Sequence, residues 1–208
     1  MDITQTIALT LGVAWASGIN LYAAMVMLGY LGSTGQMDLP PELQVLTNPL
    51  VMIAAGVMYC VEFFADKVPG IDNGWDLIQT FIRIPAGALL AAGAMGDTGL
   101  GSQLAAAATG GTLAMGSHLV KAGGRILINT SPEPVTNWFT SIGEDVTVIA
   151  GLWTALHHPL LFLTLLGLFI LAMFWLLPRI WRAIRGVFVR FGRLSGMLQG
   201  QGQEKRTP

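Results

Sequence analysis

The stretch from Pro159 to Leu177 contains a single polar side chain, Thr164. A helix needs roughly 20 apolar residues to cross a bilayer core of about 30 Å, so this stretch predicts a membrane-spanning helix. Only 11% of the chain is charged, whereas a soluble domain carries about 25% charged residues. Most of the protein surface is therefore expected to face lipid or protein instead of water.

Five further segments are long and apolar enough to be helices of the same bundle. They cover Ile7–Leu31, Pro49–Asp66, Trp75–Met95, Gln103–Ile126 and Val135–Leu156. The predicted fold class is all-α, a polytopic membrane helix bundle of about six transmembrane helices. Gly and Ala are abundant in the four middle segments, and small residues let membrane helices approach closely. These four are expected to form the packed interior, with the first and last segments at the periphery. The first segment carries Ser17-Gly18-Ile19-Asn20 at its middle, which could unwind it.

The basic residues are concentrated at one end of the chain. Seven of the eleven Lys and Arg lie between Arg179 and Arg206, which places the C-terminus in the cytoplasm because cytoplasmic loops are enriched in Lys and Arg. Six crossings then place the N-terminus in the cytoplasm as well. Residues 1–178 are predicted to be the bundle, 179–198 a basic amphipathic helix, and 199–208 a disordered tail. The Arg179–Arg193 region is expected to bind the anionic inner leaflet; a simple stop-transfer anchor is the alternative.

Seven charged or titratable residues fall near the inner ends of the middle segments. Only 11 to 14 apolar residues separate them from the outer ends, which corresponds to about 17–21 Å of helix. Charged groups inside the membrane cost on the order of 2.5–3.5 kcal/mol each and are therefore paired or face a wet cavity. The predicted ion- or substrate-binding residues are Glu62, Asp66, Arg83, His118, Lys121, Glu144 and Asp145.

Helical spacing indicates how these residues pair. Glu62 and Asp66 share one helix face, and His118, Lys121 and Arg125 share another. The preferred pairs are Arg83 with Glu144, and Lys121 or Arg125 with Glu62 or Asp66. The competing interpretation is that the charges are structural ion pairs or side chains that snorkel to the interface. A hydrogen-bonded, packed His118 is favoured over a proton carrier, and no residue spacing indicates a metal site or a cofactor.

An internal repeat is a further hypothesis. A shift of 61 residues aligns Asp76–Arg83 with Asn137–Glu144, and polar and apolar classes mostly match. The two units would be parallel helix hairpins, an arrangement known in transporters, where the site lies at the repeat interface. Independently of the repeat, Asp76 and Asn137 are expected to be first-turn or capping residues of their helices.

Five short motifs resemble those of an uncharacterised family of small bacterial integral membrane proteins, a domain of unknown function. The motifs are Ala16–Tyr22, Leu46–Pro49, Glu62–Asp72, Pro85–Gly93 and Asn129–Pro134. The resemblance covers roughly residues 10–158. It implies a multi-pass protein of the bacterial inner membrane and supplies no reaction and no functional residues.

The function expected from these observations is a membrane transporter or channel-like permease for a small ion or polar solute. Its charged vestibule would face the cytoplasm. The alternatives are a lipid-handling protein (flippase or scramblase), a structural membrane subunit, and an enzyme acting on a lipid phosphate. The last is disfavoured because the chain has no GxSxG, HExxH or aspartate-rich motif. Membrane lipids and a small ion or solute are the expected partners, with a homo-oligomer as a further hypothesis. The net charge of −1 gives no indication of nucleic-acid binding.

Overall fold

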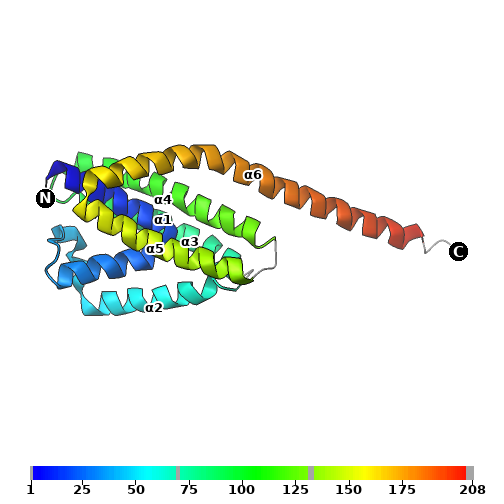
Figure 1. Cartoon of the computed structure of the whole chain (residues 1–208), viewed down its shortest axis with the longest axis horizontal. Helices are drawn as coiled ribbons and strands as arrows, with labels where there is room; N and C mark the ends of the chain where they lie inside the picture. The colour runs from blue at the N-terminus through cyan, green and yellow to red at the C-terminus, as the bar shows by residue number, and fades with distance from the viewer. Residues whose placement is uncertain (1, 69–70, 131–133, 205–208) are drawn as a thin grey trace.

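The computed structural model describes residues 2–68, 71–130 and 134–204, and these residues form helices joined by short connections (Figure 1). The elements are α1 (Ile3–Ser33), the 3₁₀ helix η1 (Pro41–Thr47), α2 (Pro49–Ala65), α3 (Ile71–Ala94), α4 (Leu100–Ile128), α5 (Pro134–His157) and α6 (Pro159–Glu204). The predicted all-α helix bundle is confirmed.

The helix α1 is folded back on itself at Asn20. This residue has non-helical backbone angles, φ −146° and ψ 96°, and the chain reverses direction there (Figure 1). Gln5 and Leu31 line one common cavity, although 26 residues of straight helix would hold them about 39 Å apart. The predicted unwinding within Ser17–Asn20 is confirmed at Asn20, where the first segment turns back.

Asn20 also starts the second half of α1. Its Oδ1 accepts a hydrogen bond from the Ala23 amide at 3.0 Å, which is the contact made by an N-cap residue. The two half-helices, residues 3–19 and 21–33, measure about 26 and 20 Å at 1.5 Å per residue. Each is shorter than a bilayer core of about 30 Å, and together they form a helical hairpin.

By length and composition, three of the described helices could cross a membrane: α1, α3 and residues Pro159–Gly186 of α6. The bent pair of η1 and α2, with an angle of 69° between them, would be a fourth. The predicted number of six spans is thus not confirmed, and α1 reaches the required length only by adding its two half-helices.

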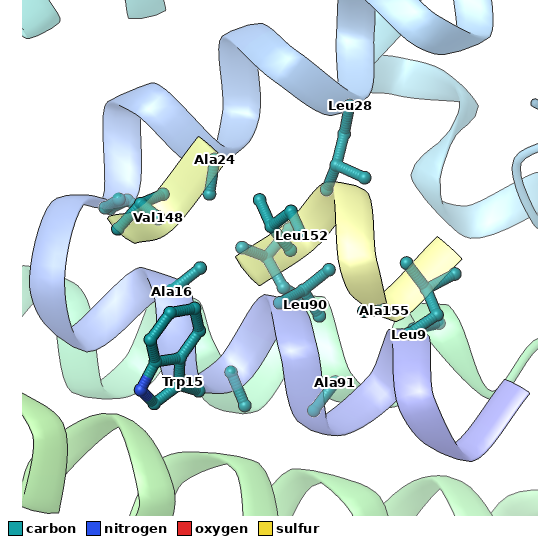
Figure 2. Packing of buried hydrophobic residues seen from close by; sticks show 14 of the residues in the cluster. Leu9, Trp15, Ala16, Ala24, Leu28, Leu90, Ala91, Val148, Leu152 and Ala155 are labelled. Atoms are coloured by element: carbon teal, nitrogen blue, oxygen red, sulfur yellow. The ribbon is translucent and has the colours of Figure 1, made fainter. Parts of the chain in front are cut away.

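The hairpin α1 lies at the centre of the bundle, contrary to the expectation that the first segment is peripheral. In its most apolar 18-residue window 78% of the residues are buried, against 11% in α6. A helix that is apolar on all sides is buried on all sides. Figure 2 shows Leu9 and Trp15 on the first half, Ala24 and Leu28 on the second, and residues of α5 packed against them.

Small residues allow the other helices to reach the hairpin. A methyl group added at Gly18 would collide with the Ala114 carbonyl and the Ser117 hydroxyl of α4, and one at Gly151 of α5 would collide with the Trp15 ring. Trp15 also packs edge-on against Phe162 of α6 at 6.0 Å between ring centroids. Close approach at glycine therefore joins α4 and α5 to α1. It also joins α3 to α4, where Gly87 faces Ala114 and Gly110 faces Ala91.

The connections of the bundle gather at two ends (Figure 1). The N-terminus lies at one end, together with residues 34–48 and the connection between α3 and α4. The connections between α2 and α3 and between α4 and α5 lie at the other end, toward which α6 runs. Because α1 turns back, its start at Ile3 and the described end of α6 lie at opposite ends of the structure (Figure 1). The side of the membrane that each terminus faces stays a prediction.

The helix α6 continues through Pro178 without a break and extends past the bundle. The predicted boundary at residue 178 is therefore not a helix end. Residues 199–204, predicted to be disordered, belong to α6, and residues 205–208 lie outside the described part of the chain.

Candidate functional site

The seven predicted site residues come together around the tip of the α1 hairpin. All are buried except Glu144, whose side chain is 15% exposed. Asp76 and Arg125 join them. We refer to these nine residues as the charged cluster: Glu62, Asp66, Asp76, Arg83, His118, Lys121, Arg125, Glu144 and Asp145.

Arg83 of α3 connects the cluster to α2 and to the hairpin. Its guanidinium pairs with Glu62 and lies 3.8 Å from Asp76. It also donates to the Gly18 carbonyl at 3.2 Å, while Ser17 Oγ donates to the Arg83 carbonyl at 3.0 Å. Glu62 and Arg83 both have 0% exposure, so this pair is dry.

Lys121 of α4 is the most highly connected cation. Its Nζ lies 3.1 Å from Glu62, 2.9 Å from Asp66 and 3.5 Å from Glu144, and it donates to the Ile19 carbonyl at 3.1 Å. One ammonium group thus joins α2, α4, α5 and the hairpin tip.

Arg125, one helical turn further along α4, pairs with two carboxylates. Its Nη2 lies 2.7 Å from Glu144 and 3.3 Å from Asp66, and its Nη1 donates to the Asp66 carbonyl at 2.7 Å. The predicted pairing of Lys121 with Glu62 or Asp66, and of Arg125 with Asp66, is therefore confirmed.

The preferred pairing of Arg83 with Glu144 is wrong. Glu144 instead contacts Lys121 and Arg125 of α4, and Arg83 finds its carboxylate on α2. The hairpin α1 packs between α3 and α5, and it keeps Arg83 apart from the helix that carries Glu144.

The hairpin contributes backbone acceptors that the sequence alone did not reveal. Gly18 and Ile19 lie at the C-terminal end of the first half-helix, where backbone carbonyls lack helical partners and carry partial negative charge. Arg83 and Lys121 donate to these two carbonyls. The cations therefore neutralise a broken helix end as well as carboxylates.

Asp145 of α5 is held by neutral donors. Asn20 Nδ2 donates to one carboxylate oxygen at 2.8 Å and the Tyr59 hydroxyl donates to the other at 3.0 Å. Asp145 makes none of the ion pairs found within the described part of the chain. Its negative charge is thus solvated by dipoles and not by a cation.

His118 is fixed in one tautomer by its neighbours. Arg83 Nη1 lies 3.3 Å from its Nδ1, and because arginine can only donate, Nδ1 is the acceptor. The ring proton then resides on Nε2, which faces the Asp76 carbonyl at 3.1 Å and Thr80 Oγ1 at 2.8 Å. This arrangement fits a neutral, packed histidine, as the sequence favoured.

Asp76 is the residue that the sequence interpretation missed, because it was assigned only a first-turn role. It is 2% exposed, and no described residue donates a hydrogen bond to either carboxylate oxygen. Its helical spacing to Thr80 and Arg83 places all three on one face of α3, and that spacing is the signal that could have identified it.

Carboxylates outnumber cations in the charged cluster. Five carboxylates (Glu62, Asp66, Asp76, Glu144, Asp145) meet three permanent cations (Arg83, Lys121, Arg125). Glu62 Oε2 and Asp66 Oδ1 also lack hydrogen-bond partners. An uncompensated buried charge costs several kcal/mol, so the excess favours uptake of protons or of another small cation.

Lys67 does not remove this excess. It lies in the connection after α2, and its Nζ donates to the Phe63 carbonyl at 2.8 Å and lies 3.5 Å from Ser141 Oγ. Burial lowers the pKa of Lys67. Even if Lys67 is counted, five carboxylates face four cations.

Metal binding has no support in the geometry. Within the described residues no group of three or more His, Cys, Asp and Glu side chains is placed to hold a metal ion. The orphaned oxygens belong to separate carboxylates that are already paired with arginine or lysine on one side.

Two cavities reach the charged cluster from different sides. One, of about 290 Å³, lies between α3 and α4 and has Asp76 and Thr80 in its wall. The other, of about 180 Å³, lies between α4, α5 and α6 and has Lys121, Arg125 and Glu144 in its wall. Arg83 itself is fully buried, and each of the two cavities reaches only part of the charged cluster.

Comparison with protein families gives one match. The family model described as "Domain of unknown function (DUF4126)" matches residues 7–179. The match begins slightly before the expected residues 10–158 and extends beyond them through the apolar part of α6. Searches of curated proteins and of solved structures found no match.

Proposed function

The chain belongs to the DUF4126 family, and from this premise we propose that it is a membrane transporter or channel-like permease for a small ion or polar solute. The charged cluster would be its binding site. The single observation that carries this proposal is the buried excess of carboxylates over cations at the tip of a broken helix.

Two physical arguments favour a transport role over a purely structural one. Ion pairs that only lock helices together work best when every charge is compensated, because an uncompensated buried charge is strongly destabilising. In addition, non-helical backbone at membrane depth is tolerated where it is buried in protein or lines a cavity, and transporters use such broken helices to bind ions and substrates. The Asn20 break, with its carbonyls facing Arg83 and Lys121, fits this pattern.

The proposed topology has α2 to α6 as crossings and α1 as a re-entrant hairpin. The bundle would lie in the bacterial inner membrane. Arg179, Arg182 and Arg185 of α6 favour a cytoplasmic C-terminal end, and the hairpin then puts the N-terminus on the outer side, in place of the cytoplasmic N-terminus expected from six crossings. The hairpins α2–α3 and α4–α5 run in the same direction (Figure 1), as the repeat hypothesis requires.

Flux measurements on the purified protein in liposomes test the proposal. Asp145→Asn is the most informative variant, because the amide oxygen can still accept from Asn20 and the amide nitrogen can donate to the Tyr59 hydroxyl, while the charge is lost. Asp97→Asn, at the exposed opposite end, is the matched control. We expect wild type and Asp97→Asn to carry flux of protons or of another small cation, and Asp145→Asn to lose most of it. Equal flux in all three proteins, or none in the wild type, would contradict the proposal.

Lipid handling is a second candidate, favoured by the cavities beside α6. An apolar cavity of about 330 Å³ between α5 and α6 shares Phe169 with the charged cavity at Glu144. An apolar cavity that adjoins charged residues would accommodate an amphiphile, with its apolar tail in the first and its polar headgroup at the second. Scrambling of fluorescent lipids by the same liposomes, unaffected by Asp145→Asn, would favour this candidate over ion transport.

The remaining partner predictions are proposals of the same kind. The exposed Trp175 and Trp181 and the arginines near them suit contact with an anionic leaflet. The mass of the purified protein in detergent tests whether it forms a homo-oligomer. Absence of flux in liposomes would favour a structural-subunit role.

A further inference from the structure

The cavity between α3 and α4 is lined in part by Asp76, whose carboxylate has no hydrogen-bond donor among the described residues. Asp76 is 2% exposed, both of its oxygens lack hydrogen-bond partners, and it lies in the wall of this cavity of about 290 Å³. Native structures rarely leave buried polar atoms without a partner, and such atoms call for a specific explanation.

Charged and titratable groups of α2, α3, α4 and α5 act electrostatically on Asp76. Arg83 comes from its own helix α3, His118 and Lys121 from α4, Asp66 from the end of α2 and Glu144 from α5. Arg83 is the closest cation, at 3.8 Å, but its Nη2 is engaged by Glu62 and its Nη1 by the Gly18 carbonyl. The attraction from Arg83 is therefore shared, and Asp76 is left with the weakest compensation of the paired carboxylates.

Neighbouring side chains supply no proton to Asp76. The His118 Nε2 proton faces the Asp76 backbone carbonyl, and Thr80 Oγ1 donates to that same carbonyl at 2.9 Å. Both donors are thus directed to the backbone, and none of the described residues donates a hydrogen bond to the carboxylate oxygens.

We propose that Asp76 is the proton-binding residue of the site and that it is loaded from water in the cavity between α3 and α4. Its role in transport rests on the proposed function, whereas the protonation does not. A hydronium ion gives its proton to one Asp76 oxygen, a new O–H bond forms, and a water molecule remains. Once Asp76 is neutral, Glu62 is the one remaining carboxylate among the two that pair with Arg83. The positive charge of Arg83 is then less compensated beside the Gly18 carbonyl at the hairpin tip.

Infrared difference spectroscopy of the full-length protein in detergent tests this inference directly. Acidification should produce the carbonyl band of a protonated, buried carboxyl group. Asp76→Asn should abolish that band, and Asp97→Asn at the opposite end should retain it. A band that survives Asp76→Asn and disappears in Asp145→Asn or Glu62→Gln would overturn the assignment.

A cavity variant keeps the test informative if Asp76→Asn does not fold. Ala122→Phe fills the cavity from the α4 side and leaves the carboxylate in place. In heavy water the carboxyl band should shift more slowly in this variant, by at least several-fold, because access is blocked. An unchanged exchange rate would contradict loading through the cavity. If the band depends on Asp76 while the liposomes carry no flux, the proton site stands and the transport proposal fails.

Discussion

Asn20 and Asp145 are joined by a hydrogen bond of 2.8 Å from the Asn20 amide to a carboxylate oxygen 125 residues later in the chain. The same Asn20 side chain caps the second half of α1 through the Ala23 amide. One side chain therefore ends the turn of the hairpin and attaches its tip to α5. Fold and candidate site depend on each other at this residue.

Asn20→Ala is expected to destabilise the protein by about 1–3 kcal/mol, since it removes an N-cap and leaves Asp145 with one donor fewer. Tyr59→Phe removes the other Asp145 donor but keeps the hairpin cap, and should cost less. Thermal unfolding in detergent compares the two. An Asn20→Ala protein as stable as wild type would mean that the side chain does not hold the turn.

Gly18→Ala is expected to disturb the contact between α1 and α4. The added methyl group would collide with backbone at Ala114 and with Ser117, and overpacking of this kind costs about 1–3 kcal/mol. Gly56→Ala in α2 meets no atom within 4 Å, and by helix propensity it should be neutral or stabilising by up to about 1 kcal/mol. If Gly18→Ala and Gly56→Ala had equal melting temperatures, the close packing at Gly18 would be contradicted.

Glu62→Gln should be strongly destabilising because Arg83 and Lys121 share this carboxylate. Removing one member of a buried pair leaves an uncompensated charge and costs about 3–5 kcal/mol. Glu42→Gln, at an exposed position in η1, is the control and should change little. Because buried pairs are poorly screened, the difference between the two should persist at high salt; a difference that salt abolishes would argue for exposed pairs.

The hairpin makes a topological prediction that cysteine labelling can check. With Cys60 replaced by Ala, single cysteines at Ile3 and Ser33, the two ends of α1, should react with a membrane-impermeant maleimide from the same side of the membrane. A cysteine at the exposed Thr130, between α4 and α5, should react from the other side. Labelling of positions 3 and 33 from opposite sides would instead indicate that α1 crosses the membrane.

Some features of this protein follow from local sequence properties. Long apolar runs broken by Pro and turn residues predict the helices, because helix formation needs only local hydrogen bonds and a surface to bury. The i, i+4 spacing of Glu62 and Asp66, and the spacing of Lys121 and Arg125, predict that acidic and basic helix faces meet, since lone charges in lipid are too costly. Neither the helices nor the pairing of acidic with basic faces requires knowledge of which helices are neighbours.

Other features depend on contacts between distant residues. The sequence Ser17–Asn20 marks a weak point in α1, but whether the chain kinks or reverses there is decided by Asp145, Arg83 and Lys121, which solvate the broken end. The pairing of Arg83 with Glu62 instead of Glu144 follows from the position of the hairpin between α3 and α5. Local sequence is therefore enough to predict the helices and the need to shelter their charges. The partner of each charge depends on the folded arrangement, because the free energy of a buried charge depends on what surrounds it in space.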